Sequence, residues 1–162
     1  MLLTRMMTRS EDQPGLRLRL AHVSRRLPIQ HEFLNALLAT TSRALERMEA
    51  VEAQEALLGF RGALDAHFQL EEEVYFPALH SLQPDLEVEI EELVREHHAL
   101  RDRLLVLEGR AGREPGPAVA QEFVELSHAL RQHESREQQA FASEAPSEIR
   151  SQVPGDRSGS SG

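Results

Sequence analysis

The feature that most constrains this chain is a helical stripe of apolar residues that recurs in four segments and is interrupted by histidine and glutamate. In the stretch "LDAHFQLEEEVYFPAL", His67 and Glu71 fall on the same stripe as Leu64, at steps of three and four residues. Such steps place residues on one face of an α-helix, and that face normally packs in an apolar core. The polar pair therefore indicates a special site inside a helical protein.

This periodicity predicts four amphipathic helices with short connections and no strand. The first is expected at about residues 28–48, with Pro28 in its first turn. The second ends near residues 77–79 and leads into a turn at residues 80–85, which contains the breaker Pro84. The third helix stops at "GRAGREPGP" and a fourth follows. The predicted fold is all-α, an antiparallel up-down-up-down four-helix bundle.

The chain is expected to form one domain between two tails. Residues 1–15 are polar and predict a flexible N-terminal tail, and residues 144–162 predict a disordered C-terminal tail. The bundle is assigned to residues 16–143. Within it, residues 16–27 fit either a strand or a helix, because their leucines alternate but also follow helical steps.

An internal two-helix repeat relates the first half of the bundle to the second at a fixed offset of 66 residues. The polar stripe residues obey this offset as three pairs: His31 and His97, His67 and His133, Glu71 and Glu137. Helix four begins near Pro117, so helix two should begin near Val51. The first connection is therefore predicted at residues 48–52, although no glycine or proline marks it.

The spacing also predicts that the four histidines share one level of the bundle. At about 1.5 Å per helical residue, the chain climbs from His31 and descends a similar distance to His67, and the later pair repeats this path. Glu71 and Glu137 then lie one turn from that level and face the same cavity. Six inward polar side chains do not make a normal core, because buried polar groups need partners.

A metal centre would satisfy all six side chains at once. They are too many ligands for one tetrahedral zinc and too rich in nitrogen for calcium or magnesium. Imidazole and carboxylate ligands suit iron among other transition metals, and two adjacent ions bridged by the glutamates would share the set. The sequence therefore predicts two adjacent transition-metal ions, with iron a suitable metal, held by the following residues: His31, His67, Glu71, His97, His133 and Glu137.

Composition excludes several other classes of protein. The chain has no cysteine, which rules out disulfides, iron–sulfur clusters and thiolate zinc sites. Its net charge of −9 argues against nucleic acid as a partner. No signal peptide and no membrane span is recognisable, so we expect a cytoplasmic protein without membrane contact. The protein partner is unknown.

Four stretches resemble the ligand helices of the hemerythrin-like, HHE cation-binding domain family: "QHEFLNALL", "HFQLEEEVYFPAL", "REHHALRDRLLVL" and "RQHESREQQAF". The resemblance covers about residues 24–143 and includes both the order of the motifs and their spacing. It implies a di-iron centre that binds dioxygen or serves in iron and redox sensing. By this resemblance the four histidines are terminal ligands, and Glu71 and Glu137 bridge the ions.

One position departs from the family pattern. Oxygen-carrying hemerythrins have a fifth histidine one turn after the third-helix ligand, where this chain has Arg101. A cation cannot ligate iron, so that coordination site would be open or filled by water, Glu134 or His98. A solvent-exposed helix face is nevertheless the better interpretation for Glu134 and His98. This departure favours sensing or iron and redox handling over bulk oxygen carriage.

Three functions remain open from the sequence. The first is binding of dioxygen or another small diatomic or peroxide ligand, as carrier or sensor. The second is a di-iron redox enzyme that acts on peroxide or nitric oxide, or donates iron for cluster repair. The third is a metal-free helical scaffold. The other histidines, His22, His80 and His128, are expected to be exposed, and Tyr75 is expected to pack at the bundle end.

Overall fold

The computed structural model describes residues 13–141 except residue 115. Every regular element among these residues is helical, which confirms the all-α prediction. The elements in chain order are α1 (Gln13–Glu46), α2 (Ala50–Leu70), the π-helix η1 (Glu71–Tyr75), α3 (Phe76–Leu82), the 3₁₀-helix η2 (Pro84–Leu86), α4 (Glu87–Ala111) and α5 (Pro117–Phe141).

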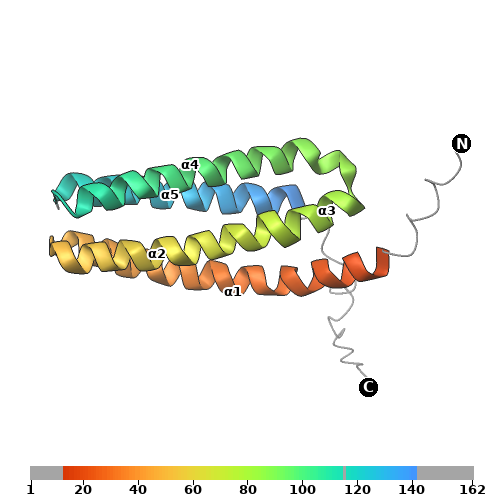
Figure 1. The fold of residues 1–162 in the computed structure, drawn as a ribbon, viewed down its shortest axis with the longest axis horizontal. Coiled ribbons are helices and arrows are strands. Elements are labelled where there is room, and N and C mark those ends of the chain that lie inside the picture. The colour runs from red at the N-terminus through yellow and green to blue at the C-terminus, as the bar shows by residue number, and fades with distance from the viewer. Residues whose placement is uncertain (1–12, 115, 142–162) are drawn as a thin grey trace, which may run out of the picture.

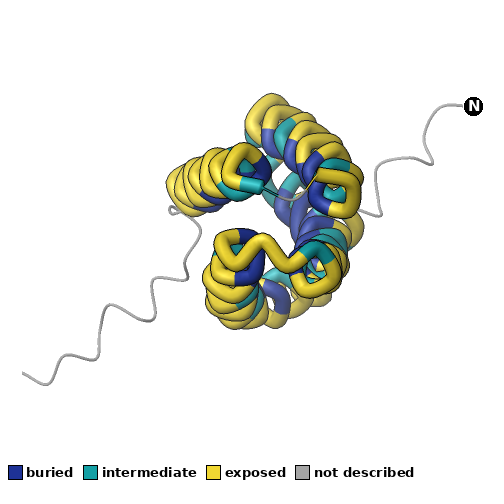
Figure 2. The backbone as a smooth tube through the Cα atoms, turned by 90° about the vertical axis from the view of Figure 1, so that its left-hand side faces the viewer, coloured by how far each residue is buried: buried dark blue, intermediate teal, exposed yellow. Residues whose placement is uncertain are grey.

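The long helices lie side by side and form a helical bundle (Figure 1). Because α2, η1 and α3 follow one another without a gap, they make one continuous rod. The four rods enclose a common centre, since α1 contacts α2, α2 contacts α4, α4 contacts α5 and α5 contacts α1. The view along the bundle shows that the buried residues face this centre and that exposed residues cover the outside (Figure 2).

The first helix differs from the prediction at its start. It runs from Gln13 to Glu46 with Pro28 inside it, so the prediction that Pro28 begins a helix is wrong. Residues 13–15, the end of the predicted N-terminal tail, form the start of this helix. Burying Val23 and Leu27 stabilises the fold by about 1.5–3 kcal/mol each, which offsets the roughly 3 kcal/mol that an internal proline costs a helix. The ambiguous residues 16–27 are therefore helical. The remaining predicted tail residues lie outside the described part of the chain.

The second rod is longer than predicted and contains a π turn. It continues through residues 77–79 to Leu82, and the predicted turn shrinks to Gln83 and the short η2 that Pro84 begins. Pro77 is tolerated because it directly follows the π segment, where the α-helical hydrogen-bond pattern is already interrupted and a missing N–H costs less. The predicted ends of the third helix and start of the fourth are confirmed by α4 and α5.

The core consists of two apolar clusters with the polar side chains between them. One cluster spans most of the bundle and includes Leu34, Phe60, Leu104 and Phe123. The other lies towards the α3 end and is made of Val23, Leu27, Tyr75, Phe76, Leu79, Leu93 and Phe141. On each rod, the histidine stands between a residue of one cluster and a residue of the other. The site is thus enclosed by hydrocarbon on both sides.

The first connection falls at residues 47–49, close to the predicted position. Met48 adopts φ 57°, the left-handed conformation that glycine usually supplies. This explains how the chain turns sharply without a glycine or proline. The Met48 side chain is 55% exposed, so packing contributes little to holding it there.

We therefore predict that Met48→Gly stabilises the protein by about 0.5–1 kcal/mol, because glycine adopts this conformation without steric strain. Denaturant unfolding of the metal-free protein measures the change. Val51→Gly is the matched control: Val51 is also exposed but helical, so the same kind of change should destabilise by about 0.5–1 kcal/mol. Equal effects of the two substitutions would contradict the strain at Met48.

Candidate metal centre

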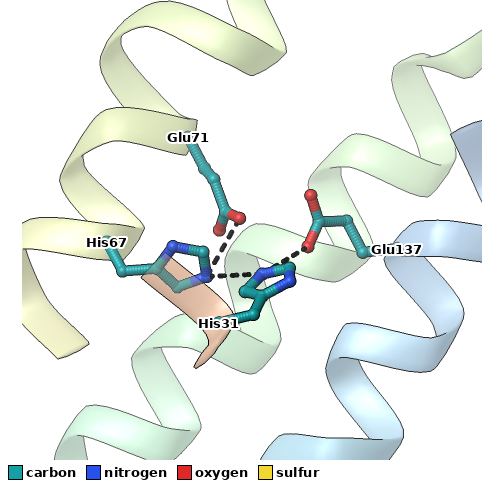
Figure 3. Close-up of side chains that lie close together, drawn as sticks. All are labelled: His31, His67, Glu71 and Glu137. Carbon is teal, nitrogen blue, oxygen red and sulfur yellow. Dashed lines mark hydrogen bonds and ion pairs between the residues drawn. The ribbon is translucent and has the colours of Figure 1, made fainter. Parts of the chain in front are cut away.

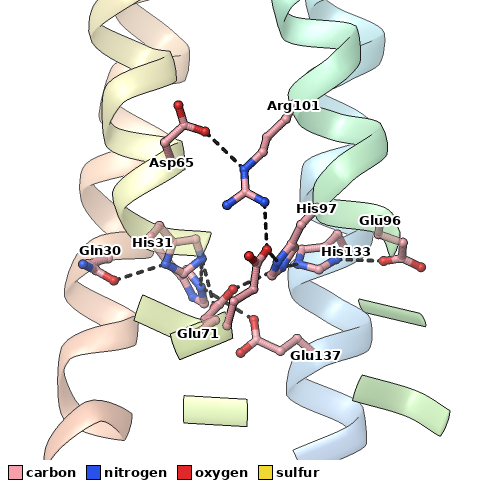
Figure 4. A network of polar contacts seen from close by, with 11 residues as sticks. Gln30, His31, Asp65, Glu71, Glu96, His97, Arg101, His133 and Glu137 are labelled. Carbon is pink, nitrogen blue, oxygen red and sulfur yellow. Dashed lines mark hydrogen bonds and ion pairs between the residues drawn. The ribbon is translucent and has the colours of Figure 1, made fainter. Parts of the chain in front are cut away.

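The four predicted histidines meet in the centre of the bundle, one from each of α1, α2, α4 and α5. They form two pairs whose Nε2 atoms face each other. The Nε2 atoms of His31 and His67 are 3.2 Å apart, and those of His97 and His133 are 2.9 Å apart. Three of the imidazoles are fully buried, and that of His31 is 13% exposed. The predicted common level of the histidines is therefore present (Figure 4).

Glu71 spans the two histidine pairs. Its Oε1 lies 3.1 Å from Nε2 of His67, and its Oε2 lies 3.2 Å from Nε2 of His97. Glu137 approaches the first pair, with Oε2 4.0 Å from Nε2 of His31 (Figure 3). Two groups of donor atoms result, each within 4.8 Å of one another: His31, His67, Glu71 and Glu137, and Glu71, His97 and His133.

The π turn lies at Glu71 itself. Glu71 is the first residue of η1, and its carbonyl accepts the N–H of Phe76, five residues later. Single π turns inside α-helices are rare and recur at functional sites, because the extra residue re-aims the side chains around it. Here the turn brings both Tyr75 and Phe76 into the core below the carboxylate, where they pack with Phe141. The predicted packing role of Tyr75 is confirmed.

The protons of one histidine pair can be assigned from its outer hydrogen bonds. Nδ1 of His97 lies 2.7 Å from Oε1 of Glu72, and Nδ1 of His133 lies 2.7 Å from Oε2 of Glu96. An ionised carboxylate can only accept, so both Nδ1 atoms carry the hydrogen. In neutral imidazoles both Nε2 atoms then present lone pairs to each other at 2.9 Å. Such a contact is repulsive unless a cation lies against both nitrogens.

Burial works against charge on every histidine of the centre. Burial, together with the neighbouring imidazoles, lowers the pKa of His67 to about 3. Burial, together with His133 and Arg101, lowers the pKa of His97 to about 2. Burial also lowers the pKa of His31 and of His133. The imidazoles are therefore neutral near pH 7, which is the form that binds metal ions.

The carboxyl groups of the centre shift in the opposite direction. Burial, followed by the nearby Glu137 carboxylate, raises the pKa of Glu71 well above its usual range. Burial raises the pKa of Glu137, and of the adjacent Glu134, to about 7. Without a cation, these acids therefore hold protons at a pH where exposed glutamates have lost them.

Several buried oxygens of the centre lack a hydrogen bond of good geometry to any of the described residues. They are both carboxylate oxygens of Glu71, Oε2 of Glu137 and Oε1 of Glu134. A buried polar atom left without a partner costs about 1–3 kcal/mol. Once the glutamates lose their protons, these oxygens and the facing imidazole lone pairs are all electron donors, so cations bound among them would satisfy both sets. The residues present therefore fit a metal centre.

Arg101 reaches the outer side of His97, where its guanidinium forms ion pairs with two carboxylates. Its Nη1 donates to Oε1 of Glu72 at 2.8 Å, and its Nε donates to Oδ1 of Asp65 at 3.2 Å (Figure 4). The guanidinium also lies 5.1 Å from the ring centroid of Phe68. Arg101 is thus a cation that holds Glu72, the residue that accepts the Nδ1 hydrogen of His97, and does not offer a ligand atom itself.

The remaining candidates divide between the core and the surface. His22, His98 and His128 are exposed as predicted, whereas His80 is half-buried. Glu134 was expected on a solvated face, and this is wrong: it is only 8% exposed. The buried face of α5 is wide enough to include both His133 and its neighbour Glu134.

Sequence reasoning missed the groups that bond to the outer nitrogens of the histidines. They are Glu72, Glu96 and Gln30, whose Oε1 lies 3.2 Å from Nδ1 of His67. A signal did exist: each is the chain neighbour of a predicted ligand. A residue adjacent to an inward ligand lies at the edge of the helix interface and can reach the next helix.

A cavity of about 410 Å³ opens beside the first histidine pair, between α1 and α5. Its lining includes His31, Glu137, Tyr75, Pro28 and Gln138. It is partly open to solvent and reaches two of the predicted ligands. A small molecule could therefore enter here and contact the His31 side of the centre.

Comparison with known proteins identifies the family. The family model described as the hemerythrin HHE cation binding domain matches residues 22–145, which include all six predicted ligands. No curated protein and no solved structure matches the chain significantly. Within the described residues, no helix is long and apolar enough to cross a membrane. The match covers most of the chain and agrees with the buried histidine–glutamate cluster, so the chain belongs to the hemerythrin HHE cation-binding domain family.

Proposed function

We propose that the chain holds two non-haem iron ions, one at each histidine pair. His31, His67 and Glu137 would hold the first ion, His97 and His133 would hold the second, and Glu71 would contact both. The observation that carries this proposal is the position of the Glu71 carboxylate, with one oxygen 3.1 Å from His67 and the other 3.2 Å from His97. The sequence resemblance adds Glu137 as a second bridge.

We also infer that the bundle is antiparallel, with an up-down-up-down order and an internal two-helix repeat, and that residues 16–143 form the domain. The short connection at residues 47–49 and the contacts between consecutive helices support this order. The repeat is supported by the matched distances within the two histidine pairs, which stand at the same 66-residue offset.

The proposed role is binding of dioxygen or a related small ligand, in sensing or in iron and redox handling. Two iron ions held in this way would supply one-electron chemistry and coordination positions for such a ligand. The cavity beside His31 supports entry of a small molecule. Arg101 supports a role other than bulk carriage, because it is paired with Asp65 and Glu72 and does not serve as a fifth imidazole.

A redox enzyme is the second candidate. It would act on peroxide or nitric oxide, or donate iron for cluster repair. The observation that favours it is the cavity of about 410 Å³, which is partly open to solvent and reaches His31 and Glu137, so that substrate could enter and product could leave. Turnover of added peroxide or nitric oxide by the iron-loaded protein would favour this candidate, and ligand binding without turnover would favour the first.

The first prediction concerns stoichiometry. After anaerobic iron loading, elemental analysis should find close to two iron ions per chain. Glu71→Ala should lower the content of both ions, because Glu71 contacts both histidine pairs, and Glu137→Ala should lower it less. Glu73→Ala is the control, since Glu73 lies in the same π segment but is exposed. Full occupancy in both ligand variants, or a single zinc with no iron uptake, would contradict the assignment.

The second prediction concerns pH. The pKa of Glu137 rises from 4.5 to about 7 in the metal-free fold, so the stability it contributes there is present below pH 4.5 and lost as pH rises through 7. Metal binding needs the ionised carboxylate and gains strength over the same range. We expect chelation to lower the melting temperature by about 10 °C at pH 8 and by clearly less at pH 6. Thermal unfolding with and without chelator measures this, and a pH-independent difference would contradict it.

The third prediction concerns Arg101. A carrier must keep its reduced state in air, and the arrangement of Arg101 leaves the His97 pair without a further imidazole. We expect the reduced, iron-loaded protein to lose its reduced state in oxygenated buffer, and Arg101→His to slow this loss. Stopped-flow absorbance measures the rate, with Arg103→His, at an exposed position of α4, as the control. An absorbance change in the unaltered protein that reverses on deoxygenation would restore the carrier interpretation.

A further inference from the structure

The two histidine pairs differ in what lies behind their imidazoles. Behind His97 and His133, carboxylates accept the Nδ1 hydrogens at 2.7 Å. Behind His67, the amide oxygen of Gln30 lies at 3.2 Å. No hydrogen bond to Nδ1 of His31 is made by the described residues. One pair is therefore backed by charged acceptors and the other by at most a neutral one.

The internal repeat shows that this difference is built into the sequence. At the offset of 66 residues, Glu96 corresponds to Gln30, and Gln138 corresponds to Glu72. Both carboxylates thus serve the His97–His133 pair, and both equivalent positions near the His31–His67 pair carry an amide. Gln138 lies in the lining of the cavity beside His31.

Arginines fix the two carboxylates that bond to the His97–His133 pair. Arg101 pairs with Glu72 at 2.8 Å, and Arg136 pairs with Glu96 at 2.6 Å. The equivalent positions of the other half carry Asn35 and Leu70, which cannot make such pairs.

The two histidine pairs also differ in aromatic stacking. Phe68 stacks on His97 with the ring centroids 3.8 Å apart and an angle of 11° between the planes. Its repeat equivalent is Glu134, which has no ring to stack on an imidazole. The imidazole of His97 is therefore held on its Nδ1 side and on its face, while that of His31 borders an open cavity.

The hydrogen-bond acceptors and the cavity both favour tighter binding of an ion at the His97–His133 pair than at the His31–His67 pair. A carboxylate that accepts the Nδ1 hydrogen fixes the ring and makes Nε2 a stronger donor, and its loss typically lowers metal affinity by about 10–100-fold. An amide acceptor does this more weakly. Glu137 would add one ligand oxygen to the His31–His67 half. That oxygen does not block the cavity, which gives water and chelators a route to this half.

We propose that the centre has a retaining half and an exchanging half. The His97–His133 half, positioned by Glu72 and Glu96, keeps its ion, and the His31–His67 half exchanges its ion through the cavity between α1 and α5. This inference rests on the proposed function, since it requires two bound ions. Glu72 and Glu96 are positioning residues in this scheme and act through the histidines.

The test measures iron release from the full chain. The protein is loaded with ferrous iron without oxygen, mixed with an excess of a coloured ferrous chelator, and followed by absorbance. Two phases of equal amplitude are expected, one ion in each. Glu72→Gln and Glu96→Gln should each accelerate the slow phase by about 10–100-fold and leave the fast phase unchanged. Gln30→Glu should slow the fast phase and leave the slow one unchanged.

The Gln30→Glu variant keeps the test decisive if a carboxylate variant does not fold, because it adds an acceptor instead of removing one. Glu108→Gln is the matched control: it breaks an ion pair with Arg61 of 2.7 Å at a largely buried site elsewhere on α2 and α4, and should change neither phase. Release of both ions in a single phase, or a response of the fast phase to Glu96→Gln, would overturn the inference. Absence of bound iron would instead overturn the proposed function.

Discussion

The fold depends on a layer of neutral imidazoles and carboxyl groups enclosed between two apolar clusters. In water these groups would be hydrated, but here hydrocarbon from all four rods surrounds them. Burial keeps the histidines neutral and pushes protons onto the glutamates, and several polar atoms at the centre have no well-formed hydrogen bond within the part of the chain that the structure describes. A bound cation removes this conflict. The metal is therefore part of the folding energetics as well as of the function.

The arrangement of the bundle follows from the requirement that each rod contribute to this layer. Each histidine stands between residues of the two clusters, so packing on both sides fixes its height. Glu71, one turn after His67, then places one carboxylate oxygen beside His67 and the other beside His97. The π turn that begins at Glu71 shifts the later residues of that rod, which lets Tyr75 and Phe76 close the centre from one end. Local helix geometry and the site thus depend on each other.

Much of this could be predicted from the sequence, because the helical period and the repeat both act over long segments. The six inward polar residues, the connection near Met48 and the ends of α4 and α5 follow from them. The continuous α1 could not be predicted, because the tolerance of Pro28 depends on burial of Val23 and Leu27 by other helices. The π turn and the burial of Glu134 were missed for a different reason: a periodic pattern does not show one extra residue in a turn, or how wide an inward face is.

The amide and carboxylate positions at the 66-residue offset have a consequence for symmetry. Two identical two-helix units could assemble into a homodimer with the same four-rod layout, but each half would then carry the same residue at every equivalent position. A carboxylate could not serve one histidine pair while an amide served the other. Joining the units in a single chain removes this restriction, because Gln30 and Glu96 are then encoded separately. Covalent linkage thus permits two histidine pairs of similar geometry to differ in the groups that bond to them.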